Sequence, residues 1–107
     1  MKHYDLDKII IKVKKWFSEH YGEDLESLIL YGSQARGDAC KYSDIDILVV
    51  LKRAFNYRQE LGNTSEFISD ISLEYDTVIS RVFISQESFL DDNSLFLINV
   101  RQEGIIL

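Results

Sequence analysis

The stretch "LYGSQARGDACKYSDIDILVV", residues 30–50, joins two apolar segments through a polar connection. "SLILY" is a short apolar run that predicts a strand ending at Gly32. "DIDILVVL", after the connection, predicts a second strand that is buried on both faces except at its polar start. Asp44 and Asp46 therefore lie at the N-terminal end of a strand expected to be buried, where an unpaired charge is costly.

The two aspartates are expected to point to the same side of their strand. Side chains alternate along a strand, so Asp44 and Asp46 share one face, about 6.6 Å apart along the backbone, while Ile45 and Ile47 take the other. Two carboxylates in contact repel by about 4 kcal/mol at an effective dielectric constant of 20 unless a cation or basic group separates them. Oxygen ligands of this kind suit Mg²⁺ or Mn²⁺, the ions used in phosphoryl and nucleotidyl transfer. The alternative is a strand end whose aspartates are simply solvated.

The residues before the connection have the chemistry of a phosphate site. Gly32 has no Cβ and lets a ligand approach the backbone, and Ser33 opens a short turn or helix whose N–H groups favour an anion. Arg36 shares the face of Ser33 if the turn is helical, and its guanidinium can donate to phosphate oxygens. The alternative for Arg36 is a salt bridge to Asp38 or Asp44.

Hydrophobic periodicity elsewhere predicts helices around these strands. Residues 5–20 read as an amphipathic helix with Asp5 as N-cap and Gly22 as stop. A helical pattern runs from Phe55 to Leu73, interrupted around "LGNT", and "DTVISRVFI" then reads as a strand.

The C-terminal part predicts one more helix. "DDNSLFLINVRQEG" is expected to be helical, capped near Asn93 or Ser94 and closed by Gly104, and "IIL" is a candidate fourth strand. "LFLINV" is expected to be a buried helix face, with an apolar surface for a partner or for self-association as the alternative. Together these patterns predict an α/β (α+β) fold, a small mixed sheet of three to four strands flanked by helices.

Composition narrows the class of protein. With 107 residues, 46% of them hydrophobic, the chain is expected to form a single domain over residues 1–107. The single cysteine, Cys40, excludes an internal disulfide, and His3 and His20 lack zinc-site spacing. A net charge of −6 disfavours direct nucleic-acid binding and suits a basic protein partner.

No apolar run is long enough for a membrane span. The lysines in "MKHYDLDKIIIKVKK" are unlike a signal peptide, so a soluble, cytoplasmic protein is expected.

"GSQARGDACKYSDID" resembles the signature of the polymerase-β-like nucleotidyltransferase superfamily. Within it, the "GSxARG…SDID" pattern is similar to the minimal nucleotidyltransferases, the MntA-type antitoxins paired with HEPN-domain toxins. The resemblance implies a polymerase-β-like palm and a site with ATP as substrate and two Mg²⁺ ions, or Mn²⁺. Metal would be held by Asp44, Asp46 and a third carboxylate on the strand after the intervening helix, and the nucleotide by Gly32, Ser33, Arg36 and Ser43.

The third carboxylate of the family corresponds to Asp76 in "LEYDTVIS". The resemblance implies that Asp76 completes the catalytic metal site and helps to deprotonate the acceptor hydroxyl. Glu74, two residues earlier, is a rival for this role, and the alternative for Asp76 is a turn or cap residue.

The implied function is that of an antitoxin. It would transfer AMP from ATP to a tyrosine hydroxyl of a cognate HEPN ribonuclease toxin and so silence it. Two alternatives remain open: a non-catalytic antitoxin that occludes its toxin, and an adenylyltransferase for a small molecule such as an aminoglycoside. Tyr31 and Tyr42 flank the motif, and either could stack on a nucleobase or simply pack.

Overall fold

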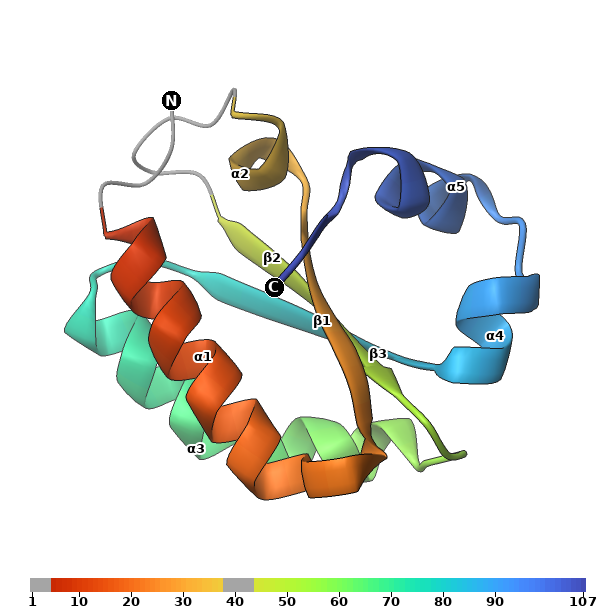
Figure 1. The fold of residues 1–107 in the computed structure, drawn as a ribbon. Coiled ribbons are helices and arrows are strands. Elements are labelled where there is room, and N and C mark those ends of the chain that lie inside the picture. The colour runs from red at the N-terminus through yellow and green to blue at the C-terminus, as the bar shows by residue number, and fades with distance from the viewer. Residues whose placement is uncertain (1–4, 38–43) are drawn as a thin grey trace.

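The computed structural model describes residues 5–37 and 44–107, which form a mixed sheet with helices on both faces (Figure 1). The strand order is β3-β2-β1-β4, with β1 antiparallel to both β2 and β4, and β2 parallel to β3. The strands are β1 (Leu25–Tyr31), β2 (Ile45–Leu51), β3 (Ile79–Ser85) and β4 (Ile105–Ile106). This arrangement confirms the predicted α+β class, including the fourth strand.

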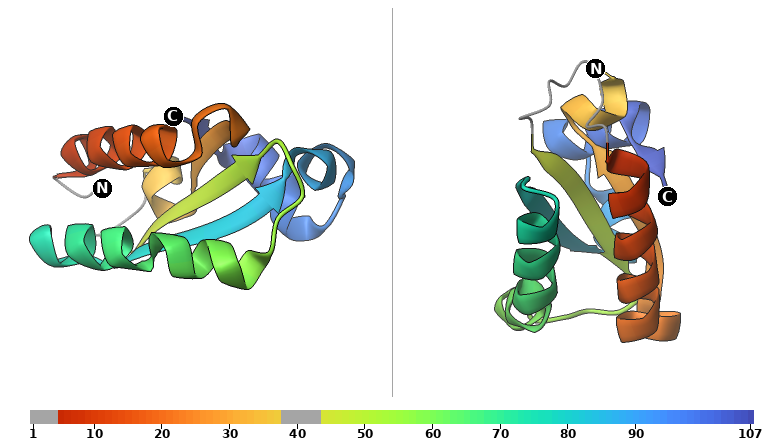
Figure 2. Two further views of the ribbon diagram at one scale, coloured as in Figure 1. Left: turned by 90° about the horizontal axis from the view of Figure 1, so that it is seen from below. Right: turned by 90° about the vertical axis from the view of Figure 1, so that its left-hand side faces the viewer.

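The helices divide between the two faces of the sheet, with α1 and α3 on one face and α4 and α5 on the other (Figure 2). Their bounds are α1 (Leu6–Tyr21), the 3₁₀ turn η1 (Gly22–Asp24), α2 (Ser33–Arg36), α3 (Tyr57–Glu74), α4 (Gln86–Asp91) and α5 (Leu95–Glu103). Within the described part of the chain, no helix has the length and apolar character needed to cross a membrane.

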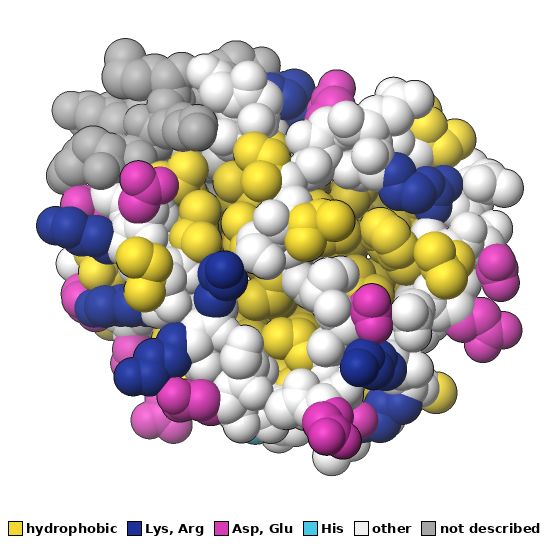
Figure 3. Space-filling model, viewed as in Figure 1, with side chains coloured by type: hydrophobic (Ala, Val, Ile, Leu, Met, Phe, Trp, Pro, Cys, Tyr) yellow, Lys and Arg dark blue, Asp and Glu magenta, His cyan; other side chains and the backbone are white. Residues whose placement is uncertain are grey.

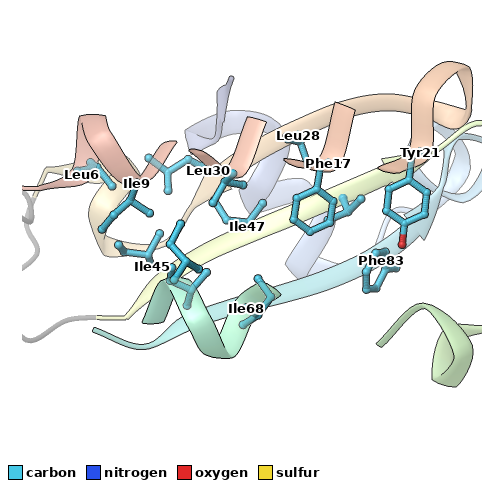
Figure 4. Close-up of a cluster of buried hydrophobic side chains, with 14 of the residues drawn as sticks. Leu6, Ile9, Phe17, Tyr21, Leu28, Leu30, Ile45, Ile47, Ile68 and Phe83 are labelled. Atoms are coloured by element: carbon cyan, nitrogen blue, oxygen red, sulfur yellow. The ribbon is translucent and has the colours of Figure 1, made fainter. Parts of the chain in front are cut away.

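The larger hydrophobic core lies between the sheet and the helices α1 and α3 (Figure 4). α1 begins after Asp5, ends at Gly22 as predicted, and turns one apolar stripe toward the sheet. β2 contributes every second residue, so that Ile45 and Ile47 lie in this core and are at most 1% exposed. The side chains of the α1 stripe are those of Leu6, Ile9, Val13, Phe17 and Tyr21.

The predicted interruption of the third helix around "LGNT" is wrong, because α3 is continuous through this segment. A glycine inside a helix costs about 1 kcal/mol relative to alanine. A tertiary contact offsets this weakness, since Arg81 of β3 donates to the hydroxyl of Thr64 (3.0 Å) and to the carbonyl oxygen of Leu61 (2.8 Å). This contact comes from another strand, so local periodicity could not predict it.

The second face carries a smaller core under α5. Ser94 caps α5 as predicted, its hydroxyl accepting a hydrogen bond from the N–H of Leu97 (3.3 Å). Only Leu97 and Val100 of this helix are buried, which partly confirms the expectation of a buried face for "LFLINV". The short helix α4, capped by Ser85, was not predicted as a separate element.

The outer side of α4, α5 and β4 keeps apolar side chains in contact with solvent. Figure 3 shows hydrophobic atoms gathered at the centre of the molecule and toward α4 and α5, with charged side chains around them. The exposed large hydrophobic residues of these elements are Leu90, Leu95, Phe96, Ile98, Ile105 and Ile106.

Candidate active site

The predicted turn and the predicted carboxylates meet at one end of the sheet. Tyr31, the last residue of β1, pairs with Asp46 of β2, so Gly32 follows directly beside the aspartate. A Cβ on Gly32 would lie 2.6 Å from Oδ2 of Asp46, and the φ angle of Gly32 is +77°. Both the close approach of the carboxylate and the left-handed backbone therefore require glycine at this position.

Gly32 leads into the four-residue helix α2. Its carbonyl oxygen accepts hydrogen bonds from the N–H groups of Ala35 and Arg36, each at 3.1 Å. Ser33 is the first helical residue and is half-buried. Gly32 and the first turn of α2 therefore lie beside Asp46, and phosphate binding by Gly32 and Ser33 stays a prediction. Ser43, also predicted to contact nucleotide, lies outside the described residues.

Arg36 connects α2 with α5. Its Nη1 lies 3.4 Å from Oε2 of Glu103, and both side chains are nearly half exposed. An exposed pair of this kind contributes about 0–1 kcal/mol, so an incoming phosphate can compete for the guanidinium. Asp38, one of the partners considered for Arg36 from the sequence, lies outside the described residues.

The two aspartates lie at the start of β2. Asp44 precedes the strand and is exposed, whereas Asp46 is half-buried inside it. Burial, followed by the negative charge of Asp44, raises the pKa of Asp46 above the ordinary value of 3.8. Carboxylate oxygens are hard donors, and a divalent cation such as Mg²⁺ would offset the cost of ionising Asp46 beside Asp44.

Asp76 closes α3 and precedes β3. It adopts a left-handed φ of +48°. The N–H of Asp76 donates to the carbonyl oxygen of Leu73 (3.3 Å), and the N–H of Thr77 donates to the carbonyl oxygen of Ser72 (3.0 Å). These two hydrogen bonds make a Schellman motif, so Asp76 occupies the cap position that the sequence had left as its alternative. Glu74, the rival acid, forms an ion pair with Lys12.

Among the described residues, no third carboxylate joins Asp44 and Asp46 in a metal-binding group. In residues 5–37 and 44–107, no group of three or more His, Cys, Asp and Glu side chains is placed to hold a metal ion. The neighbour of Asp46 on β3 is Ser80, which is in register with it and shares its face. Which residue of β3 lies beside Asp46 depends on the register of the parallel pair β2 and β3. The two strands are connected through α3 and not by a tight turn, so the sequence does not predict this register.

A family model described as a nucleotidyltransferase domain matches residues 10–107. The chain belongs to the nucleotidyltransferase family. The resemblance carried by residues 32–46 is therefore confirmed at the level of the family, over nearly the whole chain.

The relatives of this nucleotidyltransferase include proteins from Methanocaldococcus jannaschii, two of which are compared below. One, named "Putative protein adenylyltransferase MJ0604", is 34% identical over 102 residues, covering 94% of this chain and 96% of the relative. The other, named "Putative protein adenylyltransferase MJ1305", is 41% identical over 70 residues, covering 65% of this chain but only 43% of the relative.

Solved structures share the fold of this nucleotidyltransferase. A "putative nucleotidyltransferase" from Sulfolobus solfataricus superposes with a TM-score of 0.65 at 22% identity, covering 92% of this chain and 76% of the other. A mutant form of the toxin–antitoxin MntA–HpeT has a TM-score of 0.59 at 22% identity (91% and 69% covered). A toxin–antitoxin with AMP-PNP has a TM-score of 0.61 at 19% identity (92% and 69% covered). These neighbours confirm the fold predicted from the minimal nucleotidyltransferases.

Beside the Gly32 turn, the nucleotidyltransferase has a cleft that the sequence motifs did not indicate. Its volume is about 180 Å³, and it lies between β1, α2 and α5. Burial, followed by the charge of Asp46, raises the pKa of the Tyr31 phenol in its wall to about 12. The α5 residues are far from the motif in sequence, so only the fold brings them to the site. The cleft is lined by Tyr31, Gly32, Arg36, Phe96, Asn99, Val100 and Glu103.

Proposed function

We propose that this nucleotidyltransferase transfers AMP from ATP to a hydroxyl group of a partner protein. The observation that carries the proposal is the close approach of the Gly32 turn to Asp46, which puts the proposed phosphate site beside the carboxylates. Relatives named as protein adenylyltransferases support the reaction, and a structural neighbour with AMP-PNP supports ATP as the donor.

In this reaction the residues of the chain bind and orient the donor. The backbone of Gly32 and the side chains of Ser33 and Arg36 hold the β- and γ-phosphates, with Ser43 as a further proposed contact. Asp44 and Asp46 would hold two Mg²⁺ ions, or Mn²⁺, with Asp76 proposed as a further ligand. When bound, such ions stabilise the negative charge that develops on the phosphate oxygens.

The covalent step replaces the α–β phosphoanhydride bond of ATP with a phosphoester bond to the acceptor. The acceptor oxygen forms a bond to the α-phosphorus, the bond from that phosphorus to the bridging oxygen breaks, and pyrophosphate leaves. The hydroxyl proton passes to a carboxylate, the role that the family resemblance gives to Asp76. Asp76 would have to reach the site from the turn that closes α3.

For the acceptor we propose a tyrosine of a cognate HEPN ribonuclease toxin, which the modification would silence in the cytoplasm. Two toxin–antitoxin complexes among the structural neighbours support a toxin partner. The net charge of −6 suits docking on the basic surface of an RNA-binding enzyme.

The experiment incubates the chain with the candidate toxin, Mg²⁺ and α-³²P-labelled ATP. Label should move to the toxin, and intact-mass measurement should show one or more added AMP units. The double variant Asp44→Asn with Asp46→Asn should lose transfer, by at least a hundredfold if the pair supplies the main electrostatic stabilisation. Transfer that persists in the double variant would refute the proposal.

A second candidate is a non-catalytic antitoxin that occludes its toxin. The finding that favours it is the lack of a three-carboxylate group among the described residues. In that case the double variant would still neutralise the toxin at equal molar amounts, without any mass added to it. A small-molecule acceptor would instead show as label in a low-molecular-weight product.

A further inference from the structure

The cleft beside Gly32 continues directly from the proposed phosphate site. One wall is the Gly32 turn itself, and another wall is α5, which contributes Phe96 and Asn99. Arg36 and Glu103 pair at 3.4 Å and join α2 to α5 within the lining. A group covalently attached to phosphates on the turn would therefore reach this cleft without crossing the sheet.

The lining combines aromatic faces with an amide. The rings of Tyr31 and Phe96 meet edge to face, with centroids 5.3 Å apart and planes at 88°. Phe96 remains 42% exposed, so part of its side chain can contact a ligand. Asn99 is exposed and carries both a donor and an acceptor. A flat aromatic ring with hydrogen-bonding edges matches these features.

We infer that this cleft holds the nucleobase of the donor nucleotide, with the base stacked on Phe96 and its edge hydrogen-bonded to Asn99. The inference rests on the proposed function, because it assumes that phosphates bind at the Gly32 turn. Asn pairs in a bidentate manner with N6 and N7 of adenine, whereas the corresponding edge of guanine offers two acceptors. Asn99 therefore favours adenine over guanine.

Volume and charge favour a base over the other parts of the reactants. About 180 Å³ is below the 300–1,000 Å³ typical of a site for a whole small molecule, so the cleft suits one part of a nucleotide. The carboxylate of Glu103 in the lining repels an additional phosphate but not a neutral ring.

Direct binding measurements separate the base from the phosphates. Mg²⁺-ATP, Mg²⁺-GTP and inorganic triphosphate with Mg²⁺ are titrated by calorimetry into the wild-type chain and into Phe96→Ala and Asn99→Ala. Leu95→Ala is the matched control, because Leu95 lies on the same helix, is 74% exposed and does not line the cleft. Thermal unfolding of each variant verifies that it is folded.

Phe96→Ala should weaken ATP binding on the order of tenfold and leave triphosphate binding unchanged, because only the stacking contact is lost. Asn99→Ala should reduce the ratio of ATP to GTP affinity, and Leu95→Ala should change nothing. Equal weakening of ATP and triphosphate, or a Phe96→Ala affinity equal to that of Leu95→Ala, would overturn the inference. Failure of the wild-type chain to bind ATP at all would overturn the proposed function as well, which distinguishes the two failures.

Discussion

The two faces of β2 use alternate residues of one strand for opposite purposes. On the side of α1 and α3, Ile45, Ile47, Val49 and Leu51 are all at most 1% exposed. On the other side, Leu48 and Val50 are buried in the smaller core, but Asp46 stands at the end of the row. The first face closes the core along the whole strand, so the second can carry charge at one end without opening the interior. One face of β2 thus stabilises the fold, and the other face carries the aspartate of the proposed site at its end.

The largest expected effect comes from breaking the closed face. Ile47→Ala removes a side chain that is 1% exposed in the larger core, and such truncations cost about 2–5 kcal/mol. Chemical denaturation should show this loss as a lower midpoint with an unchanged slope. Leu90→Ala, at a site that is 67% exposed on the second face, should stay within about 0.5 kcal/mol of the wild type. Equal losses in both variants would contradict the contrast between the faces.

The glycine that lies against Asp46 should be less replaceable than the one that ends α2. Gly32 and Gly37 have similar φ angles, +77° and +80°, but a Cβ would meet Asp46 only at Gly32. Gly37→Ala should therefore cost about 1–2 kcal/mol, from the left-handed backbone alone. Gly32→Ala should cost more and also displace the carboxylate, so that Mg²⁺-ATP binding falls. Equal free energies of unfolding and equal Mg²⁺-ATP affinities in the two variants would show that the contact with Asp46 affects neither stability nor binding.

The cap position of Asp76 can be separated from its proposed role in the site. Asn adopts the left-handed conformation readily, so Asp76→Asn should retain nearly all the stability of the wild type, whereas Asp76→Ala should lose about 1 kcal/mol or somewhat more. Transfer activity then reports on the carboxylate itself. Loss of transfer in the well-folded Asp76→Asn chain would support the ligand role, and full transfer would reduce Asp76 to a cap.

The sequence predicted those features of the site that depend on neighbours along the chain. Alternation along a strand placed Asp46 opposite Ile45 and Ile47, and the turn residue Gly32 came from the same local pattern. The features that depend on strand register or on distant contacts were not predictable in this way. Ser80 lies beside Asp46 only because β2 and β3 pair in parallel in one particular register.

Contacts between residues distant in sequence also explain why the continuity of α3 and the cleft beside Gly32 were not predicted. Arg81 supports the middle of α3, which local propensity interrupts. Phe96 and Asn99 reach the site because α5 packs over β1, where Gly104 allows its end to approach closely. A Cβ on Gly104 would lie 2.5 Å from the carbonyl oxygen of Val100 and 2.6 Å from Cγ2 of Ile29.

The smallest effect on stability concerns Asp46 and depends on pH. Because the pKa of Asp46 is raised above 3.8 in the folded state, the folded chain binds this proton more tightly than the unfolded chain. Stability is therefore lost as the pH rises through the folded pKa, and ionised Asp46 destabilises the metal-free protein at pH 7. Asp46→Asn removes this cost, so the gap between variant and wild type should close as the pH falls below 3.8.

Thermal unfolding of the wild type and Asp46→Asn at pH 7, without metal and then with Mg²⁺ and AMP-PNP, tests the site most directly. Without metal, the variant should unfold at the higher temperature, because the neutral amide of Asn avoids the cost of a half-buried negative charge. With Mg²⁺ and nucleotide the order should reverse, because only the wild type offers both carboxylates to the cation. A variant that is less stable without metal, or an equal rise in both proteins, would contradict a cation and nucleotide site at the end of β2.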